Sequence, residues 1–155
     1  MPSFSVFGRQ RGDVELFARV FGKAALFSNF NVHAFPGPNR ERNGTVSSAY
    51  VRVEKDALAT KEIPETPDFC VILDSSISRK LCGKPGVTII NTAKKAKDRA
   101  IDASAIDARR AFPAMLGALL KAYGKVSLKN TKLAMEQEGE KESYATVEAG
   151  YKAMK

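Results

Sequence analysis

The stretch FSVFGRQRGDVELFARVFGKAALF, residues 4–27, decides how this chain folds. Phe4, Val6 and Phe7 form a short apolar run that favours a strand entering a core. A polar turn with two glycines follows, and glycine adopts backbone angles that other residues avoid. Beyond the turn, apolar residues recur at helical spacing, and Asp13 is a suitable N-cap. A strand, a glycine-containing turn and a helix in this order form the first unit of a Rossmann-like α/β fold.

The turn between this strand and this helix has two interpretations. The dinucleotide fingerprint G-x-G-x-x-G needs a second glycine where a pyrophosphate approaches the backbone, and Gln10 and Arg11 occupy that region. Arg9 and Arg11 could still bind an anion through their side chains and the free amides of the helix N-terminus. The alternative is a turn whose arginines are solvated or contact another protein chain. The pattern favours this second interpretation.

The composition is that of one globular domain. The chain has 155 residues, of which 44% are hydrophobic, enough for a sizeable core. Its net charge of +8 favours an acidic partner or an anionic ligand. However, the basic residues are scattered, and the dense run at 94–99 has no interleaved aromatic residues for stacking bases. The charge therefore gives little support for nucleic acid binding.

Residues that commonly hold metals are few. Cys70 and Cys82 cannot supply a disulfide framework, a metal cage or the four thiolates of an iron–sulfur cluster. Cys70 lies in an apolar run, so we expect a small buried apolar residue there. His33 is the only histidine, which excludes a histidine-based metal site and leaves a structural role as our expectation. With no signal peptide or membrane-length apolar run, we expect a cytoplasmic protein without membrane contact.

Strands and helices are predicted to alternate along the rest of the chain. Continuous apolar runs at 69–73 and 87–90 are typical of strands buried on both faces. We expect these two runs and the strand at 4–7 to be neighbours in one core sheet. Further strands are expected at 31–35, 46–53 and 101–106, about two helical turns at 75–84, and helices at 114–123, 127–138 and 142–154. The expected fold is one three-layer α/β domain of residues 1–155, with a Rossmann-like sheet that is mostly parallel or mixed and with C-terminal helices.

Polar residues follow several of the predicted strands. In open α/β sheets ligands bind at the carboxyl ends of strands, so these loops are the default candidate site. Asp74 and Glu41 could form a carboxylate pair for acid–base work, but a strand-end aspartate more commonly caps the next helix. We expect no catalytic residue and no metal site in this chain. The candidate ligand or interface residues are Gly8, Arg9, Arg11, Gly12, Arg40, Glu41, Arg42, Asn43, Gly44, Asp74, Asn91 and Thr92.

The order and spacing of these motifs resemble the gamma subunits, or gamma domains, of 2-oxoacid:ferredoxin oxidoreductases such as pyruvate synthase. FGRQRGD at 7–13 is similar to the family's opening H-G-R-G-G-Q-G, and FPGPNRERNG at 35–44 is similar to its F-P-x-x-G-P-E-R-R-G loop. Further matches are LD at 73–74, NT at 91–92, IDAS at 101–104, MLGA at 115–118 and GY at 150–151. The first turn has lost glycines, Phe112 replaces a usual asparagine, and the segments after Asp74 and Thr92 are short.

The resemblance implies an accessory subunit of a complex that oxidatively decarboxylates a 2-oxoacid, pyruvate among them, or runs in reverse. Thiamine diphosphate, magnesium, iron–sulfur clusters and coenzyme A belong to the assembled complex, and none is expected to bind this chain alone. Alpha-, beta- and delta-type subunits are the implied partners, with ferredoxin an indirect one. The gamma part packs on the thiamine-binding chains and helps enclose the coenzyme A side of the site, so we expect the isolated chain to be inactive. A stand-alone dinucleotide-binding domain and a basic nucleic-acid-binding module remain the alternatives.

Overall fold

A mixed six-stranded sheet is the centre of the fold in the computed structural model, which describes residues 2–37, 46–55, 67–94 and 99–154. The strands are β1 (Ser3–Gly8), β2 (Asn31–Pro36), β3 (Ser47–Glu54), β4 (Phe69–Ile72), β5 (Val87–Asn91) and β6 (Arg99–Ile101), in the order β2-β3-β1-β4-β5-β6. β1, β4, β5 and β6 run parallel, whereas β3 is antiparallel to both β1 and β2. The mostly parallel sheet is confirmed, and β4 and β5 follow β1 as neighbours as expected.

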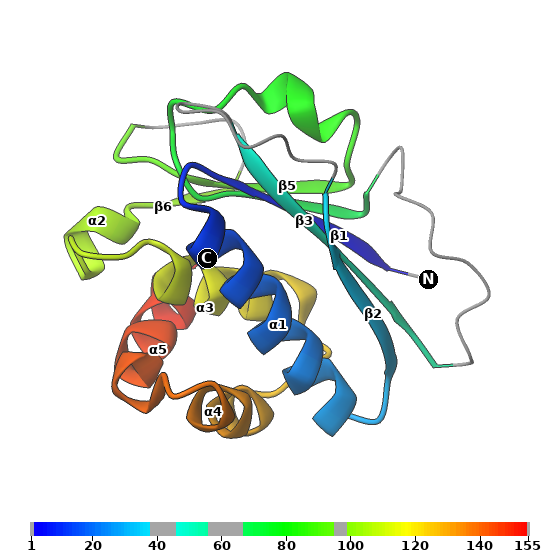
Figure 1. The fold of residues 1–155 in the computed structure, drawn as a ribbon. Coiled ribbons are helices and arrows are strands. Elements are labelled where there is room, and N and C mark those ends of the chain that lie inside the picture. The colour runs from blue at the N-terminus through cyan, green and yellow to red at the C-terminus, as the bar shows by residue number, and fades with distance from the viewer. Residues whose placement is uncertain (1, 38–45, 56–66, 95–98, 155) are drawn as a thin grey trace.

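Helices cover one face of this sheet (Figure 1). They are α1 (Arg11–Phe27), α2 (Ala103–Ile106), α3 (Phe112–Tyr123), α4 (Leu128–Gln137) and α5 (Tyr144–Ala153), with a short 3-10 helix η2 (Lys141–Ser143) before α5. Phe4 of β1 and Phe21 of α1 are fully buried in this layer, with ring centroids 4.7 Å apart. All residues of α3 from 112 to 120 are buried, so this helix lies at the centre of the helical layer.

The helix α1 begins three residues earlier than its sequence suggests. Gln10 is the extended residue before it and makes no side-chain capping bond, so the prediction of Asp13 as N-cap is wrong. Asp13 instead lies in the first turn, where a carboxylate is favoured by the positive end of the helix dipole. The amide of Val14 donates to the Gln10 carbonyl at 3.1 Å, which closes the first helical turn ahead of the predicted start.

The second face of the sheet is covered by the segment between β4 and β5. This covering segment, residues 73–86, contains a four-residue 3-10 helix, η1 (Arg79–Cys82), where about two helical turns were expected at 75–84. Ile77 and Cys82 are buried against Phe7, Ile72 and other apolar side chains of the sheet. Among the described residues, the layer opposite the helices is therefore this segment, without an α-helix.

The two cysteines form a disulfide between β4 and η1. Cys70 is fully buried, as expected, but it is bonded to Cys82 and is not a free apolar residue. Their Cα atoms are 5.9 Å apart, within the usual range for a disulfide. The cysteine count excluded a framework of several disulfides, but it did not exclude a single disulfide that fixes one loop to one strand.

The strand predicted at 101–106 is only partly present. β6 ends at Ile101, and α2 starts at Ala103. Asp102 explains the change, because its carboxylate accepts a hydrogen bond from the Ala105 amide at 3.2 Å and so caps the helix. β6 is the last strand in the sheet order, as the prediction of an edge strand required.

The C-terminal helices agree with the sequence prediction. Gly124 ends α3 in the left-handed conformation at φ 74°, and the Ser127 hydroxyl caps α4 by accepting from the Asn130 amide. The helices α3 and α5 touch through Gly117 and Gly150, where an added Cβ would collide with backbone atoms of the facing helix. The MLGA and GY motifs, 35 positions apart in the sequence, therefore meet in this one contact.

Candidate functional site

The turn from β1 into α1 brings the backbone close to the end of β4. A Cβ on Gly8 would lie 2.7 Å from Val14 Cγ2 and 3.2 Å from Leu73 Cδ1, so this position needs glycine for close packing. A Cβ on Gly12 would meet nothing within 4 Å. Of the two glycines in the turn, Gly8 thus has a structural requirement, whereas Gly12 lies beside open space.

A cleft of about 170 Å³ lies at the carboxyl ends of β1 and β4, beside the N-terminus of α1. Carboxyl ends of strands are where open α/β sheets place their ligands. The lining residues are Gly8, Arg9, Gln10, Asp13, Leu73, Asp74, Arg109, Arg110, Ala111 and Phe112. Three of the sequence candidates, Gly8, Arg9 and Asp74, are brought together in this hollow.

Asp74 is held by the turn that starts the covering segment. Its Oδ1 accepts hydrogen bonds from the Ser76 amide at 2.9 Å and from the Ser76 hydroxyl at 2.7 Å. These two bonds, followed by the charge of Arg9, lower the pKa of the Asp74 carboxyl, although partial burial works against this. Asp74 is therefore ionised at neutral pH and stabilises a turn, which makes it a poor general acid.

Arg9 and Arg11 point to different partners. The Arg9 Nε donates to the Ser76 hydroxyl at 3.3 Å, so this arginine lies along the Asp74 side of the cleft. Arg11 forms an ion pair with Glu15 one helical turn later, at 2.9 Å between Nε and Oε1. Arg9 therefore lines the cleft, while Arg11 lies on the solvated flank of α1.

Asn91 and Thr92 have structural roles beside the cleft. The Asn91 side-chain amide donates to the Leu73 carbonyl at 2.9 Å, and its oxygen accepts from the Ala103 amide at 3.0 Å. Thr92 Oγ1 accepts from the Lys94 amide at 3.1 Å. Asn91 thus joins the end of β4 to the start of α2, and neither residue lines the cleft.

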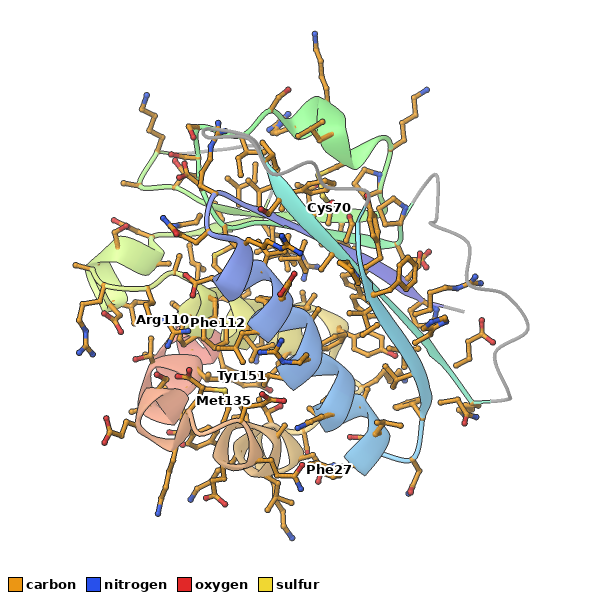
Figure 2. The ribbon with its side chains drawn as sticks, in the orientation of Figure 1. Phe27, Cys70, Arg110, Phe112, Met135 and Tyr151 are labelled. Atoms are coloured by element: carbon orange, nitrogen blue, oxygen red, sulfur yellow. A yellow bond between two sulfur atoms is a disulfide. The ribbon has the colours of Figure 1, made fainter. Side chains whose placement is uncertain are left out.

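Sequence reasoning missed Arg110, which connects three parts of the fold. Its guanidinium donates to Glu140 Oε2 at 2.9 Å and to Asp13 Oδ1 at 3.2 Å, and it lies 4.7 Å from the centre of the Phe112 ring. Figure 2 shows Arg110 and Phe112 side by side between α1 and α5. Partial burial opposes the charge, but the bonds to Glu140 and Asp13 outweigh it and raise the pKa of Arg110.

Arg109, next to it, was also missed and behaves differently. Its side chain is 89% exposed, and its Nε contacts Asp107 Oδ1 at 3.3 Å. A pair of adjacent arginines shortly before a helix with proline in its first turn was the available sequence signal, but similar pairs are frequent on solvated surfaces. The cleft therefore presents Arg9 and Arg109 at its exposed rim and the ion-paired Arg110 inside.

Several predicted features lie outside the described residues. The loop residues Arg40, Glu41, Arg42, Asn43 and Gly44 belong to these, and so does most of the basic run at 94–99. Within the described ranges, no group of three or more His, Cys, Asp or Glu side chains is arranged to hold a metal ion. In the same part of the chain, no helix is both long enough and apolar enough to cross a membrane.

A second hollow lies between α1 and the strands β2 and β3. It has a volume of about 260 Å³, and most of its lining is apolar, including Ala18, Phe35 and Ala49. Its charged residues are Glu15 and Arg19, and Arg19 contacts Glu138 at 3.5 Å. None of the candidate site residues lines this hollow, although it is the larger one, so the polar cleft remains the better candidate.

Comparison with known proteins agrees with the resemblance stated from the sequence. The family described as pyruvate ferredoxin/flavodoxin oxidoreductase matches residues 8–155. The chain is 27% identical over 159 residues to the pyruvate/ketoisovalerate oxidoreductases common subunit gamma of Pyrococcus abyssi, a match that covers 85% of this chain and 86% of the relative.

Solved structures share the fold over nearly the whole chain. Pyruvate oxidoreductase subunit PORC of Thermotoga maritima superposes with a TM-score of 0.83 at 22% identity, over 99% of this chain and 97% of that one. The gamma subunit of a keto/oxoacid ferredoxin oxidoreductase from Geobacter sulfurreducens gives a TM-score of 0.78 at 16% identity, over 99% of this chain and 98% of that one.

A third structure places the same fold inside a longer chain. The 2-oxoglutarate:ferredoxin oxidoreductase of Magnetococcus marinus, solved with 2-oxoglutarate, coenzyme A and succinyl-CoA bound, gives a TM-score of 0.72 at 15% identity. The match covers 97% of this chain and 30% of that one. From the family match over residues 8–155, we conclude that the chain belongs to the pyruvate ferredoxin/flavodoxin oxidoreductase family.

Proposed function

We propose that this chain is the gamma subunit of a 2-oxoacid:ferredoxin oxidoreductase complex, acting as one domain over residues 1–155 in the cytoplasm. It packs on the thiamine-binding subunits and forms part of the coenzyme A side of the active site. Alpha-, beta- and delta-type chains are its proposed partners, and these carry the chemistry. The observation that supports this most is the polar cleft at the carboxyl ends of β1 and β4, with Arg9 and Arg109 at its rim.

The small size of the cleft supports the proposal that this chain forms only part of a ligand site. Pockets that enclose a drug-sized ligand commonly measure roughly 300–1,000 Å³, whereas this cleft measures about 170 Å³. It is large enough for one phosphate group or one partner side chain, but too small to enclose coenzyme A. The chain is therefore proposed to supply one wall, and the partner subunits the rest.

The charges of the cleft fit an anionic group at its rim. A guanidinium can grip a phosphate or a carboxylate with two parallel hydrogen bonds, and Arg9 and Arg109 are both exposed there. Deeper in the cleft, Asp13 and Asp74 would repel an anion, so binding is proposed at the rim.

The remaining cofactors of the complex are assigned to other chains. Both cysteines are joined in a disulfide, and two sulfurs would in any case be too few for an iron–sulfur cluster. The sequence also has no acidic GDG-type motif for the magnesium of thiamine diphosphate. The two alternatives, a free-standing nucleotide-binding domain and a nucleic-acid-binding module, are not favoured, because the family match covers residues 8–155.

The test is reconstitution with the partner chains purified from the native source. We expect Arg9→Ala combined with Arg42→Ala, and separately Arg109→Ala, to leave the melting temperature of the free subunit nearly unchanged. In the complex, the same variants should weaken assembly or raise the concentration of coenzyme A needed for turnover. Arg9→Lys should behave more like alanine than like arginine, because lysine lacks the two-armed geometry.

Lys125→Ala is the matched control, since it removes one exposed positive charge that is not part of the cleft. If the arginine variants assemble and turn over coenzyme A like the parent, neither the cleft nor the loop candidate Arg42 belongs to the functional face. If no partner chain co-purifies under any condition, the assignment as a subunit of a complex is itself wrong.

A further inference from the structure

The covering segment, residues 73–86, is attached to the sheet by few side chains. Among residues 74–86, Ile77 and Cys82 alone are buried, and the others are exposed or half-buried. These two pack against Phe7, Cys70, Ile72 and Ile90 on the sheet face opposite the helices. Figure 1 shows the segment as a separate layer above the strands, away from α1 and α3. Leu73, at the start of the segment, is buried in the main core, and its amide donates to the Phe7 carbonyl at 2.8 Å. Beyond Leu73, the packing of the segment depends on one isoleucine and one bonded cysteine.

The backbone hydrogen bonds inside the segment are local. The Ile77 amide donates to Asp74, the Leu81 amide to Ser78 and the Gly83 amide to Lys80, all within three residues. Local bonds of this kind stabilise turns, but they do not tie a segment to the sheet beneath it. A segment with few buried contacts opens at low free-energy cost unless a covalent link prevents it.

We propose that Cys70 and Cys82 form a thiol–disulfide switch that holds the covering segment on the sheet when oxidised and releases it when reduced. Cys70 lies on the rigid strand β4, whereas Cys82 lies on η1, next to Leu81, which is 50% exposed. The covalent bond therefore connects a fixed element to a weakly held one. In the cytoplasm, the location proposed above, disulfides are mostly transient or redox-sensing. A bond between a fixed strand and a weakly held segment fits such a role.

The exchange needs a dithiol as reductant. A thiolate of the dithiol attacks Cys82 Sγ during a local opening, the bond to Cys70 Sγ breaks, and Cys70 leaves as a thiolate that takes up a proton. The second thiol of the reductant then displaces Cys82 as a thiol. Two electrons and two protons pass from the dithiol to the protein, and the reductant becomes the disulfide.

The switch acts on the candidate site because the same segment forms one side of the cleft. Asp74 starts the segment, and Ser76 receives the hydrogen bond from Arg9. Release of the segment frees both residues from this arrangement, so the rim around Arg9 changes with the redox state. This step does not depend on which ligand or partner the cleft takes.

Hydrogen exchange of the full-length chain, followed by mass spectrometry of its peptides, tests the proposal. The protein is prepared in two states, oxidised and treated with dithiothreitol, and alkylation counts the thiols in each. We expect the hydrogen-bonded amides between 77 and 83 to exchange at least about tenfold faster in the reduced state. A peptide from α4 is the internal reference and should change less than about twofold.

A variant with Cys70→Ala and Cys82→Ala should exchange like the reduced parent and be insensitive to dithiothreitol. If that variant does not fold, the comparison of the oxidised and reduced states of the parent still tests the proposal. Equal exchange of the segment in both states overturns the proposal. Loss of protection throughout the chain on reduction overturns it as well, because the bond would then stabilise the whole fold. A parent protein that keeps two free thiols after treatment with an oxidant also overturns the proposal.

Discussion

The contact between α3 and α5 yields a sharp prediction for Gly150→Ala. An added Cβ would lie 2.7 Å from the carbonyl carbon and from the Cα of Ala114, and it would come still closer to the carbonyl oxygen. These are backbone atoms in the buried first turn of α3, so they cannot rotate away as the end of a side chain could. The two helices must separate to accept the methyl group.

Two opposing effects decide the magnitude. Alanine is favoured over glycine inside a helix by about 1 kcal/mol. Forcing an extra carbon into a packed core costs about 1–3 kcal/mol, and we take the upper end because backbone must move. The net loss in the free energy of unfolding is therefore about 2 kcal/mol, which lowers the melting temperature of a domain of this size by about 4–8 °C.

Thermal unfolding followed by circular dichroism measures this directly, and urea unfolding gives the free energy. Gly12→Ala is the matched control, because the same change there meets nothing within 4 Å and does not lie at positive φ. We expect that control to melt at the parent temperature or slightly above it. A Gly150→Ala variant that melts as high as the Gly12→Ala variant would show that the close approach of α3 and α5 is not needed for stability.

Three further predictions concern charges and cofactors. Arg110→Ala should lower the free energy of unfolding by about 1–2 kcal/mol in urea titrations, because it leaves Asp13 and Glu140 without their shared cation. Arg110→Lys should recover only part of this loss. An alanine variant as stable as the parent would contradict the prediction. The hydrogen bond from Lys23 lowers the pKa of Glu138, so its stabilising effect is complete above the ordinary pKa of 4.5 and is lost as the pH falls below it. Unfolding of the parent and of Glu138→Gln between about pH 3 and 7 should therefore converge at the acidic end, and a constant difference would refute the assignment. Finally, the purified chain, after treatment with iron and sulfide, should show no iron–sulfur absorbance and no 2-oxoacid oxidation; a visible cluster band would place chemistry in this chain.

The central sheet could be predicted from the sequence because of its apolar runs. Residues 69–73 and 87–90 are apolar at nearly every position, which requires cover on both faces, and both faces are covered in the structure. Helix ends were predictable where one local residue determines them, as the Ser127 hydroxyl does for α4 and the left-handed backbone of Gly124 does for α3. Local rules failed at 101–106, where the cap formed by Asp102 outweighed the apolar alternation.

The site was less predictable because its contacts are not local. Arg110 contacts Asp13 across 97 positions of sequence, and no spacing rule connects residues so far apart. The disulfide is closer in sequence, with a separation of 12, but it forms because the covering segment folds back over β4. Arg9 and Asp74 were both candidates because each follows a predicted strand, and the structure places both beside one cleft, since the ends of parallel strands meet at one edge of the sheet.

The order of the elements, with β1 and α1 ahead of the helices that cover them, also affects how the protein is made. α1 is synthesised early, but its Phe17 packs near Phe112 of α3, with ring centroids 6.5 Å apart. At about 5–20 residues per second, Phe112 leaves the ribosome roughly 3–12 s after Glu54, the end of β3. During that interval the nascent chain holds three strands and an apolar helix without the later helices that will cover them. A fragment that ends before α3 would leave the apolar face of α1 uncovered, and we therefore expect such a fragment to aggregate.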